Sequence, residues 1–185
     1  MGGACSPILW NFLHDYQKKR ILTFFDPTQD LLKTGYHITQ SKIALGSGGF
    51  WGKGYMQGTQ AYLNFLPEKQ TDFIFTLLCE EWGFVGGFFL LSLYVLLIVM
   101  GFRITLTTQN DFGRFVAAGM TMTFFLYAFI NVAMVMGLVP VVGVPLPLVS
   151  YGGTAMLTIL MGFGFLLSVG LHRNIKIPQL SIGVF

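Results

Sequence analysis

The fold is decided by an apolar stretch that reads Trp82-Gly-Phe-Val-Gly-Gly-Phe-Phe-Leu-Leu-Ser-Leu-Tyr-Val-Leu-Leu-Ile-Val-Met-Gly-Phe102. Its 21 residues include no charged side chain. At about 1.5 Å per helical residue the stretch would be roughly 30 Å long, which matches the hydrocarbon core of a bilayer. It therefore predicts a membrane-spanning helix, and we expect that helix to begin earlier, near Phe73.

A second apolar region, from Phe115 to Leu171, contains no Asp, Glu, Lys, Arg or His. The region is too long for one span and long enough for two. Pro140, Pro145 and Pro147 interrupt it near its middle, where they would end a helix. We therefore predict three membrane-spanning helices, over residues 73–102, 115–139 and 149–171.

The composition supports an all-α integral membrane protein. Hydrophobic residues make up 54% of the 185-residue chain and charged residues 10%, whereas soluble domains carry about 25% charged residues. The net charge of +3 is spread along the chain, without the basic run that nucleic-acid binding would need. Cys5 and Cys79 lie far apart and the three histidines stand alone, so we expect neither a disulfide framework nor a metal site built from these residues.

The charges near the spans predict the orientation. Arg103 and Arg114 lie in the loop between the first two spans, and His172 and Arg173 open the tail after the third. Three spans place both segments on one side, which the positive-inside tendency makes cytoplasmic. Residues 1–72 would then form an extracytoplasmic loop region with short interfacial helices, one of them near residues 36–45. Residues 73–185 would form the membrane region, which ends in a short cytoplasmic tail.

A glycine-rich segment precedes the first span, with six glycines from Gly46 to Gly58. It does not match the Walker pattern, because Gly54 follows Lys53 where Ser or Thr is needed. Two interpretations remain. The segment could be a loop that folds tightly against the membrane through positive φ angles, or a cradle of backbone amides for a phosphate-bearing lipid.

Asp72 lies where this polar region meets the first span. Its carboxylate could cap the helix, or it could act as a general base within hydrogen-bond reach of a hydroxyl group. Charged and amide side chains nearby in sequence, and one serine of the Pro-rich loop, favour the second role. We take as candidate substrate-binding residues Lys53, Gln57, Gln60, Glu68, Lys69 and Ser150.

Glu80 and Glu81 lie about two turns or more beyond Asp72 and point about 100° apart. Either both sit near the interface and reach water, or one binds a cation or a hidden basic partner. Gly83 and Gly87 form a GxxxG face that predicts close helix packing. The same packing is expected at Gly162 and Gly164.

The Pro-rich loop, Pro140-Val-Val-Gly-Val-Pro-Leu-Pro-Leu-Val-Ser-Tyr-Gly-Gly153, should fold back over a cavity. Non-helical backbone at membrane depth is tolerated only where protein buries it or water lines it. Ser150 or Tyr151 would line that cavity.

Four stretches of the chain resemble the C-terminal half of the SEDS family, and they are closer to its rod-shape members (RodA) than to its division members (FtsW). They occur in the family's order and cover the chain from about residue 10. Two are the Pro-rich loop just quoted and Phe65-Leu-Pro-Glu-Lys-Gln-Thr-Asp-Phe-Ile-Phe75. The others are residues 12–27 and 35–49.

The resemblance implies a peptidoglycan glycosyltransferase of the bacterial inner membrane, which polymerises lipid II outside the cytoplasmic membrane with inversion at the sugar carbon. It implies roles in cell-wall elongation, cell shape or cell division, and a class B penicillin-binding protein as partner. Asp72 matches the family's essential aspartate. Lys53, Lys69 or a divalent cation, Mg²⁺ or Mn²⁺, would stabilise the pyrophosphate leaving group. The first half of the family pattern is absent, so the isolated chain could lack activity.

Two other functions remain open at this point. A flippase or transporter of lipid-linked precursors would also use broken helices and intramembrane acids. A non-catalytic membrane scaffold would only bind a penicillin-binding protein. Lipid translocation without glycan synthesis would favour the first, and co-purification with the synthase without activity would favour the second.

Overall fold

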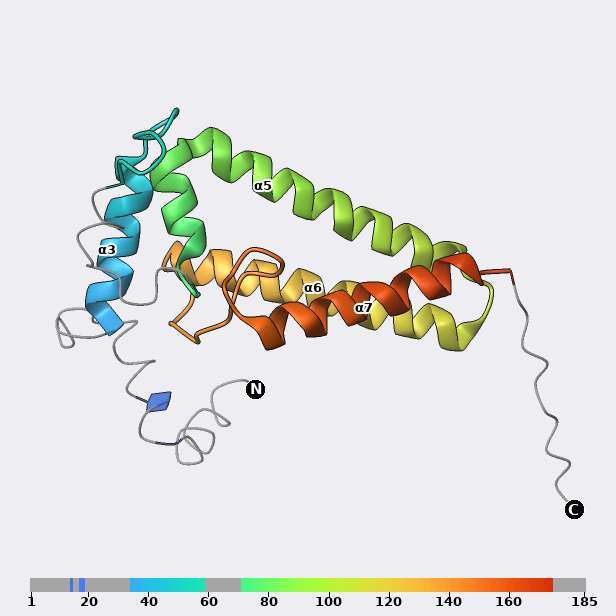
Figure 1. Ribbon diagram of the computed structural model, residues 1–185. Helices are drawn as coiled ribbons and strands as arrows, with labels where there is room; N and C mark the ends of the chain where they lie inside the picture. Colours follow the sequence, from blue (N-terminus) through green and yellow to red (C-terminus); the bar gives the residue numbers. More distant parts are fainter. Residues whose placement is uncertain (1–13, 15–16, 19–33, 59–70, 175–185) are drawn as a thin grey trace, which may run out of the picture.

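The structure is a computed structural model that describes residues 14, 17–18, 34–58 and 71–174. The elements in these residues are four α-helices: α3 (Thr34–Ser47), α5 (Ile74–Thr107), α6 (Asp111–Val135) and α7 (Gly153–Leu171). The last three are long and apolar enough to cross a membrane. The all-α class and the three spans expected from the sequence are thus confirmed. In Figure 1, α6 and α7 run side by side, and the long part of α5 runs along them.

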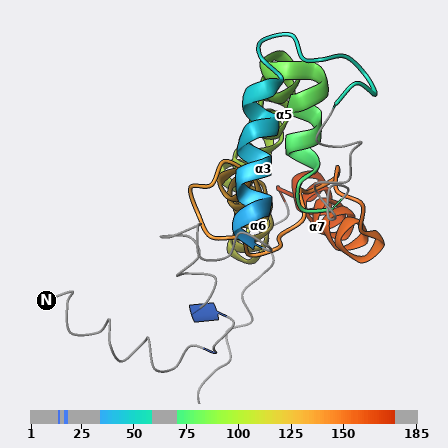
Figure 2. The same ribbon diagram turned by 90° about the vertical axis from the view of Figure 1, so that its left-hand side faces the viewer.

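Helix α5 is bent at Gly83, whose φ of 67° and ψ of −161° are not helical. Figures 1 and 2 show that the short first piece, Ile74 to Trp82, runs beside α3 across the end of the bundle. The membrane-length piece begins only after the bend. Gly83 and Gly87 therefore do not share one face of a continuous helix, contrary to what the GxxxG pattern predicted. A Cβ atom on Gly87 would lie 2.7 Å from Cys79 Sγ of the same helix rather than against a neighbouring one.

The long helices approach one another closely at other small residues. A Cβ atom on Gly101 of α5 would lie 2.4 Å from Thr121 Oγ1 of α6, and one on Gly162 of α7 would lie 3.3 Å from Met120 Sδ. Such positions let membrane helices pack where a larger side chain would hold them apart. Gly162 thus packs as expected. Gly164 does not, since among the described residues no atom of another helix lies within 4 Å of its built Cβ.

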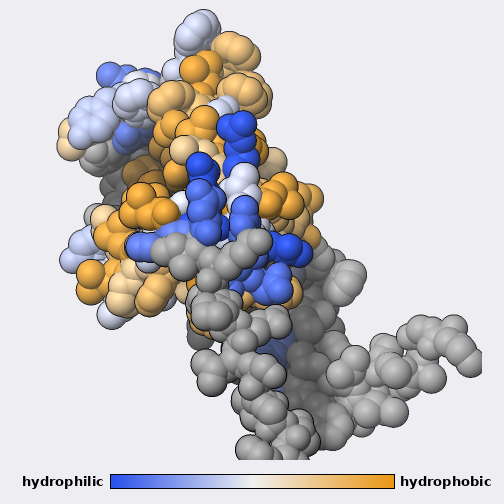
Figure 3. Space-filling view, turned by 90° about the vertical axis from the view of Figure 1, so that its right-hand side faces the viewer, coloured by the Kyte–Doolittle hydropathy of each residue, from blue (hydrophilic) through white to orange (hydrophobic). Residues whose placement is uncertain are grey.

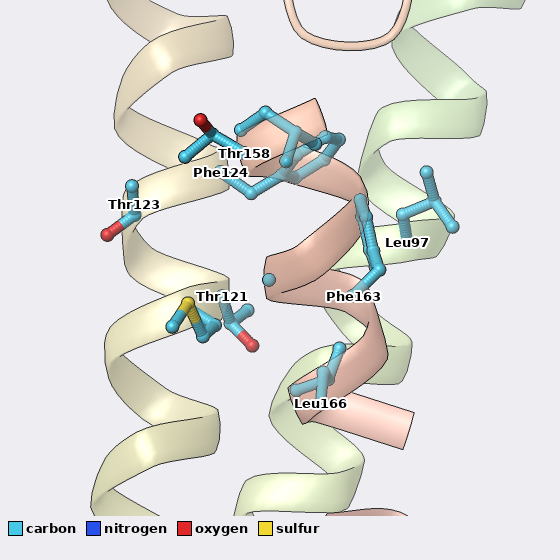
Figure 4. A pocket seen from close by; sticks show the side chains of 10 residues that line it. Leu97, Thr121, Thr123, Phe124, Thr158, Phe163 and Leu166 are labelled. Carbon is cyan, nitrogen blue, oxygen red and sulfur yellow. The ribbon is translucent and has the colours of Figure 1, made fainter. Parts of the chain in front are cut away.

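Aromatic rings join the three helices at their centre. The rings of Tyr94, Phe124 and Phe163 contact edge to face, with centroids 5.5 Å and 5.2 Å apart. Beside them lies a cavity of about 70 Å³, in which Figure 4 shows Leu97 of α5, Phe124 of α6 and Phe163 of α7. Its lining is apolar apart from threonine hydroxyls, so this cavity offers no acid or base for chemistry.

The end of the bundle far from α3 is polar. Figure 3 looks onto this end and shows hydrophilic side chains gathered there. The exposed charged and polar residues at this end include Arg103, Asp111, Arg114, His172 and Arg173. The Gln109 amide donates to the Arg173 carbonyl at 3.1 Å, so the loop after α5 and the end of α7 meet as expected. Their cytoplasmic location stays a prediction.

Candidate active site

Two side chains from other elements hold the turn that carries Asp72. Asn131 Nδ2, near the end of α6, donates to the Asp72 carbonyl at 2.9 Å. The Ser150 hydroxyl donates to the carbonyl of Thr71. The N-cap position of α5 belongs to Phe73, with no side-chain cap bond in the described residues. The cap interpretation of Asp72 therefore gains no support.

The Asp72 carboxylate lies beside Gly143 of the loop between α6 and α7. A Cβ atom built on Gly143 would lie 3.2 Å from Asp72 Oδ2. Gly143 is exposed and has a φ of 79°, a conformation that favours glycine. Asp72 is half-buried, and the residue that its carboxylate faces has no side chain.

The loop between α6 and α7, residues 136–152, is fixed by side-chain hydrogen bonds. Ser150 Oγ accepts from the Leu146 amide at 2.7 Å. Tyr94 donates from its hydroxyl to the Pro147 carbonyl at 2.6 Å. Asn131 Nδ2 donates to the Val144 carbonyl at 2.6 Å. Partners within the protein make this non-helical backbone tolerable near the membrane.

A cavity of about 270 Å³ lies beside this loop, between α6 and α7. Ser150 is among its lining residues, together with Tyr127 and Thr154. The expectation that the loop folds over a cavity lined by Ser150 is confirmed. Tyr151 is 79% exposed and is not part of that lining.

The glycine-rich loop, residues 48–58, supplies hydrogen-bond partners for the backbone groups that the break in α5 leaves without helical ones. In an unbroken helix the amides of Phe84 and Val85 would donate to the carbonyls of Glu80 and Glu81. Here each of these four groups bonds to the loop instead. The bonds run from Lys53 N to Glu80 O (3.0 Å), from Gly54 N to Glu81 O (3.0 Å), from Phe84 N to Gly49 O (3.0 Å) and from Val85 N to Phe50 O (3.3 Å).

This exchange needs close approach of the two backbones. A Cβ atom on Gly52 would lie 2.1 Å from the Glu81 carbonyl oxygen, and one on Gly83 would lie 2.3 Å from the Gly52 nitrogen. The amides of Lys53 and Gly54 are committed to protein carbonyls and cannot also cradle a phosphate. The contacts therefore favour the tightly folded loop over the phosphate cradle.

An ion pair fastens the same loop. Lys53 Nζ lies 2.9 Å from Glu80 Oε1, and the Glu80 side chain is only 1% exposed. Glu80 therefore has the hidden basic partner that was one of the two alternatives. On its other side, a Cβ atom on Gly58 would lie 3.0 Å from Glu80 Oε2. The loop thus surrounds a buried carboxylate.

The candidate residues fall into two groups. Asp72 and Ser150 are brought together at the start of α5, whereas Lys53 and Gln57 lie at the far end of its short first piece. The side chain of Gln57 is exposed and lies over Gly54. Gln60, Glu68 and Lys69 lie outside the described residues.

The sequence interpretation missed Asn131, which is fully buried and bonded to the Asp72 carbonyl. Its signal was an amide side chain inside an apolar span. The described residues contain no group of three His, Cys, Asp or Glu side chains that could hold a metal ion. The divalent cation thus stays a prediction.

Known proteins resemble this chain over most of its length. A family model described as "Cell cycle protein" (FTSW_RODA_SPOVE) matches residues 3–175. Peptidoglycan glycosyltransferase MrdB of Escherichia coli K12 is 55% identical over 172 residues, which are 92% of this chain and 46% of that protein. Peptidoglycan glycosyltransferase RodA of Treponema pallidum is 43% identical over 87% of this chain and 37% of its own length. Stage V sporulation protein E of Bacillus subtilis is 44% identical over 86% and 43%. The chain spans about half the length of the curated relatives it matches.

Two solved structures are also similar. One comes from work titled "Structural coordination of polymerization and crosslinking by a peptidoglycan synthase complex". It matches with a TM-score of 0.75 and 29% identity, over 94% of this chain and 47% of that chain. The other is a mutant of the rod shape determining protein RodA of Thermus thermophilus, with a TM-score of 0.56 and 35% identity over 59% and 37%. Both support the helical arrangement described above.

Proposed function

Because the chain belongs to the FtsW/RodA/SpoVE family of cell cycle proteins, we propose that it forms the C-terminal half of a peptidoglycan glycosyltransferase that polymerises lipid II. The observation that carries the proposal is the 55% identity, over 92% of the chain, to a protein of that name. The similarity to MrdB and RodA proteins favours a role in cell-wall elongation and cell shape.

In the proposed reaction, Asp72 is the general base. Its carboxylate takes the proton of the 4-hydroxyl group of the acceptor sugar while that oxygen attacks the anomeric carbon of the donor strand. The bond from this carbon to the pyrophosphate oxygen breaks, polyprenyl pyrophosphate leaves, and the carbon is inverted. The half-buried carboxylate beside Gly143 supports this role, because a base must be both held in place and reachable.

The leaving pyrophosphate needs positive charge as the bond breaks. The ammonium group of Lys53 is already balanced by Glu80 at 2.9 Å, which makes it a poor source of that charge. We therefore assign the charge to Lys69 or to a divalent cation, Mg²⁺ or Mn²⁺.

The proposed setting is the bacterial cytoplasmic membrane, with Asp72 outside and the C-terminus in the cytoplasm. The positions of Arg103, Arg114 and Arg173, at the end of the bundle opposite Asp72, support this orientation. A class B penicillin-binding protein is the proposed partner. The similar structure from a peptidoglycan synthase complex that polymerises and crosslinks is in line with such an assembly.

The test uses a chimera, because the chain spans about half of its relatives. This chain replaces the matching segment of E. coli MrdB, and the purified chimera receives labelled lipid II with the partner penicillin-binding protein. We expect polymer from the chimera and a loss of at least about 100-fold with Asp72→Asn. The matched control is Asp111→Asn, an exposed aspartate at the opposite end, which should keep full activity.

Near-normal polymerisation by the Asp72→Asn chimera would rule out the proposed base. An inactive parent chimera that moves fluorescent lipid II across vesicles would favour the transporter. One that only co-purifies with the penicillin-binding protein would favour the scaffold.

A further inference from the structure

The Asn131 side chain bonds to both the Asp72 turn and the loop beside it. One hydrogen of Nδ2 goes to the Asp72 carbonyl at 2.9 Å and the other to the Val144 carbonyl at 2.6 Å. Val144 follows Gly143, against which the Asp72 carboxylate lies. Asn131, Val144, Gly143 and Asp72 therefore form a closed ring of contacts, which we call the Asp72 circuit.

The orientation of this amide follows from its partners. Both acceptors are carbonyl oxygens, so only the nitrogen of the Asn131 amide can face them. Each hydrogen of the nitrogen is then used. A second contact, from Ser150 to the Thr71 carbonyl, holds the preceding residue to the same loop. The peptide groups on both sides of Asp72 are thereby fixed: the one before it by Ser150 and the one after it by Asn131.

The Asn131 amide uses both of its donor hydrogens but not its acceptor oxygen. The residue is 0% exposed, and its Oδ1 atom has no hydrogen-bond partner among the described residues. A buried acceptor without a partner opposes folding, whereas the two donated bonds satisfy backbone carbonyls to which an apolar side chain could not donate. The two bonds to the Asp72 circuit are what this amide adds to the site.

We propose that Asn131 is a positioning residue that holds the Asp72 carboxylate against Gly143, at the place where the acceptor hydroxyl gives up its proton. This inference rests on the proposed function. Asn131 itself does not touch the reacting atoms; it sets the backbone from which the base projects. A displacement of about 1 Å at such a group can cost roughly 100-fold in rate.

The test is Asn131→Asp in the chimera, because aspartate keeps the shape and replaces both donors with an oxygen. We expect kcat to fall by roughly 100-fold while the KM for lipid II stays within about twofold. The matched control is Ser41→Ala. Ser41 is also 0% exposed and bonds to Thr76 and to the Val135 carbonyl, but it joins α3 to the bundle and not to the Asp72 circuit. Its kcat should stay within about threefold.

A kcat near the parent value for Asn131→Asp would overturn the proposal. So would an equal loss of kcat in Ser41→Ala. If Asn131→Asp fails to fold, Asn131→Ser decides by the same criterion, since a shorter side chain cannot hold both carbonyls. The outcome is separable from that of the proposed function. An active Asn131→Asp with an inactive Asp72→Asn sinks only the positioning role, and an active Asp72→Asn sinks the function itself.

Discussion

The Lys53–Glu80 ion pair should couple the glycine-rich loop to the bent helix with a measurable energy. Glu80→Gln would remove the carboxylate from beside the Lys53 ammonium, while Lys53→Met would remove the ammonium from beside the Glu80 carboxylate, whose side chain is 1% exposed. Breaking a buried pair by removing one partner costs about 3–5 kcal/mol. Lys53 is 27% exposed, so water can solvate part of its charge. We therefore expect Glu80→Gln to lower the free energy of unfolding by about 3 kcal/mol and Lys53→Met to lower it by more.

The double variant Lys53→Met/Glu80→Gln combines the same two substitutions and removes both charges from the site. Neither charge then remains beside a missing partner, so the double variant should lose less stability than the sum of the two single losses. The free energy of unfolding of each chimera, from denaturant titration in detergent micelles, gives the coupling energy. Glu81→Gln is the matched control. Glu81 is 9% exposed and forms no ion pair within the described residues, so its loss should stay below about 1 kcal/mol. Additive losses in the double variant would refute the coupling.

Two further predictions concern the bend and the loop beside the active site. Gly83→Ala should lower the free energy of unfolding by at least about 3 kcal/mol, because φ is 67° and the new Cβ would lie 2.3 Å from the Gly52 nitrogen. Gly164→Ala is the control, since the space around Gly164 is open among the described residues. Equal losses in the two variants would contradict the claim. Tyr94→Phe should cost about 1–2 kcal/mol, because the Pro147 carbonyl loses its buried donor. The half-exposed Tyr127→Phe should change the same unfolding midpoint little, and no difference between the two would argue against the bond's contribution.

The sequence predicts the three spans because hydropathy is a local property. The apolar runs Trp82–Phe102 and Phe115–Leu171 can be recognised without knowing which residues they contact. The prolines between α6 and α7 mark a real interruption. Asp72 and Ser150 could be singled out in the same way, as polar groups at the ends of apolar helices. The structure adds that Ser150 bonds to the residue before Asp72.

The bend at Gly83 could not be predicted from its own surroundings. A glycine in an apolar helix fits close packing as well as a break, and the loop atoms that make the break possible come from about 30 residues earlier in the chain. Lys53 illustrates the same limit. Its charge is visible in the sequence but its pairing with Glu80 is not, so the sequence alone favours a role in substrate binding. Asn131 escaped notice because its role depends on two carbonyls that only the fold brings together.

The crossed backbone bonds at the bend make the length of the glycine-rich loop a fixed quantity. Deleting or inserting one residue between Gly49 and Gly54 would misalign the donors with the acceptors on both sides of the break. Related chains should therefore vary in residue type on the outside of this loop but keep the same number of residues in it. The connection from Thr107 to Asp111 bonds to the end of α7 through the Gln109 amide but does not bridge a break in a helix, so it should tolerate a change of length better than this loop.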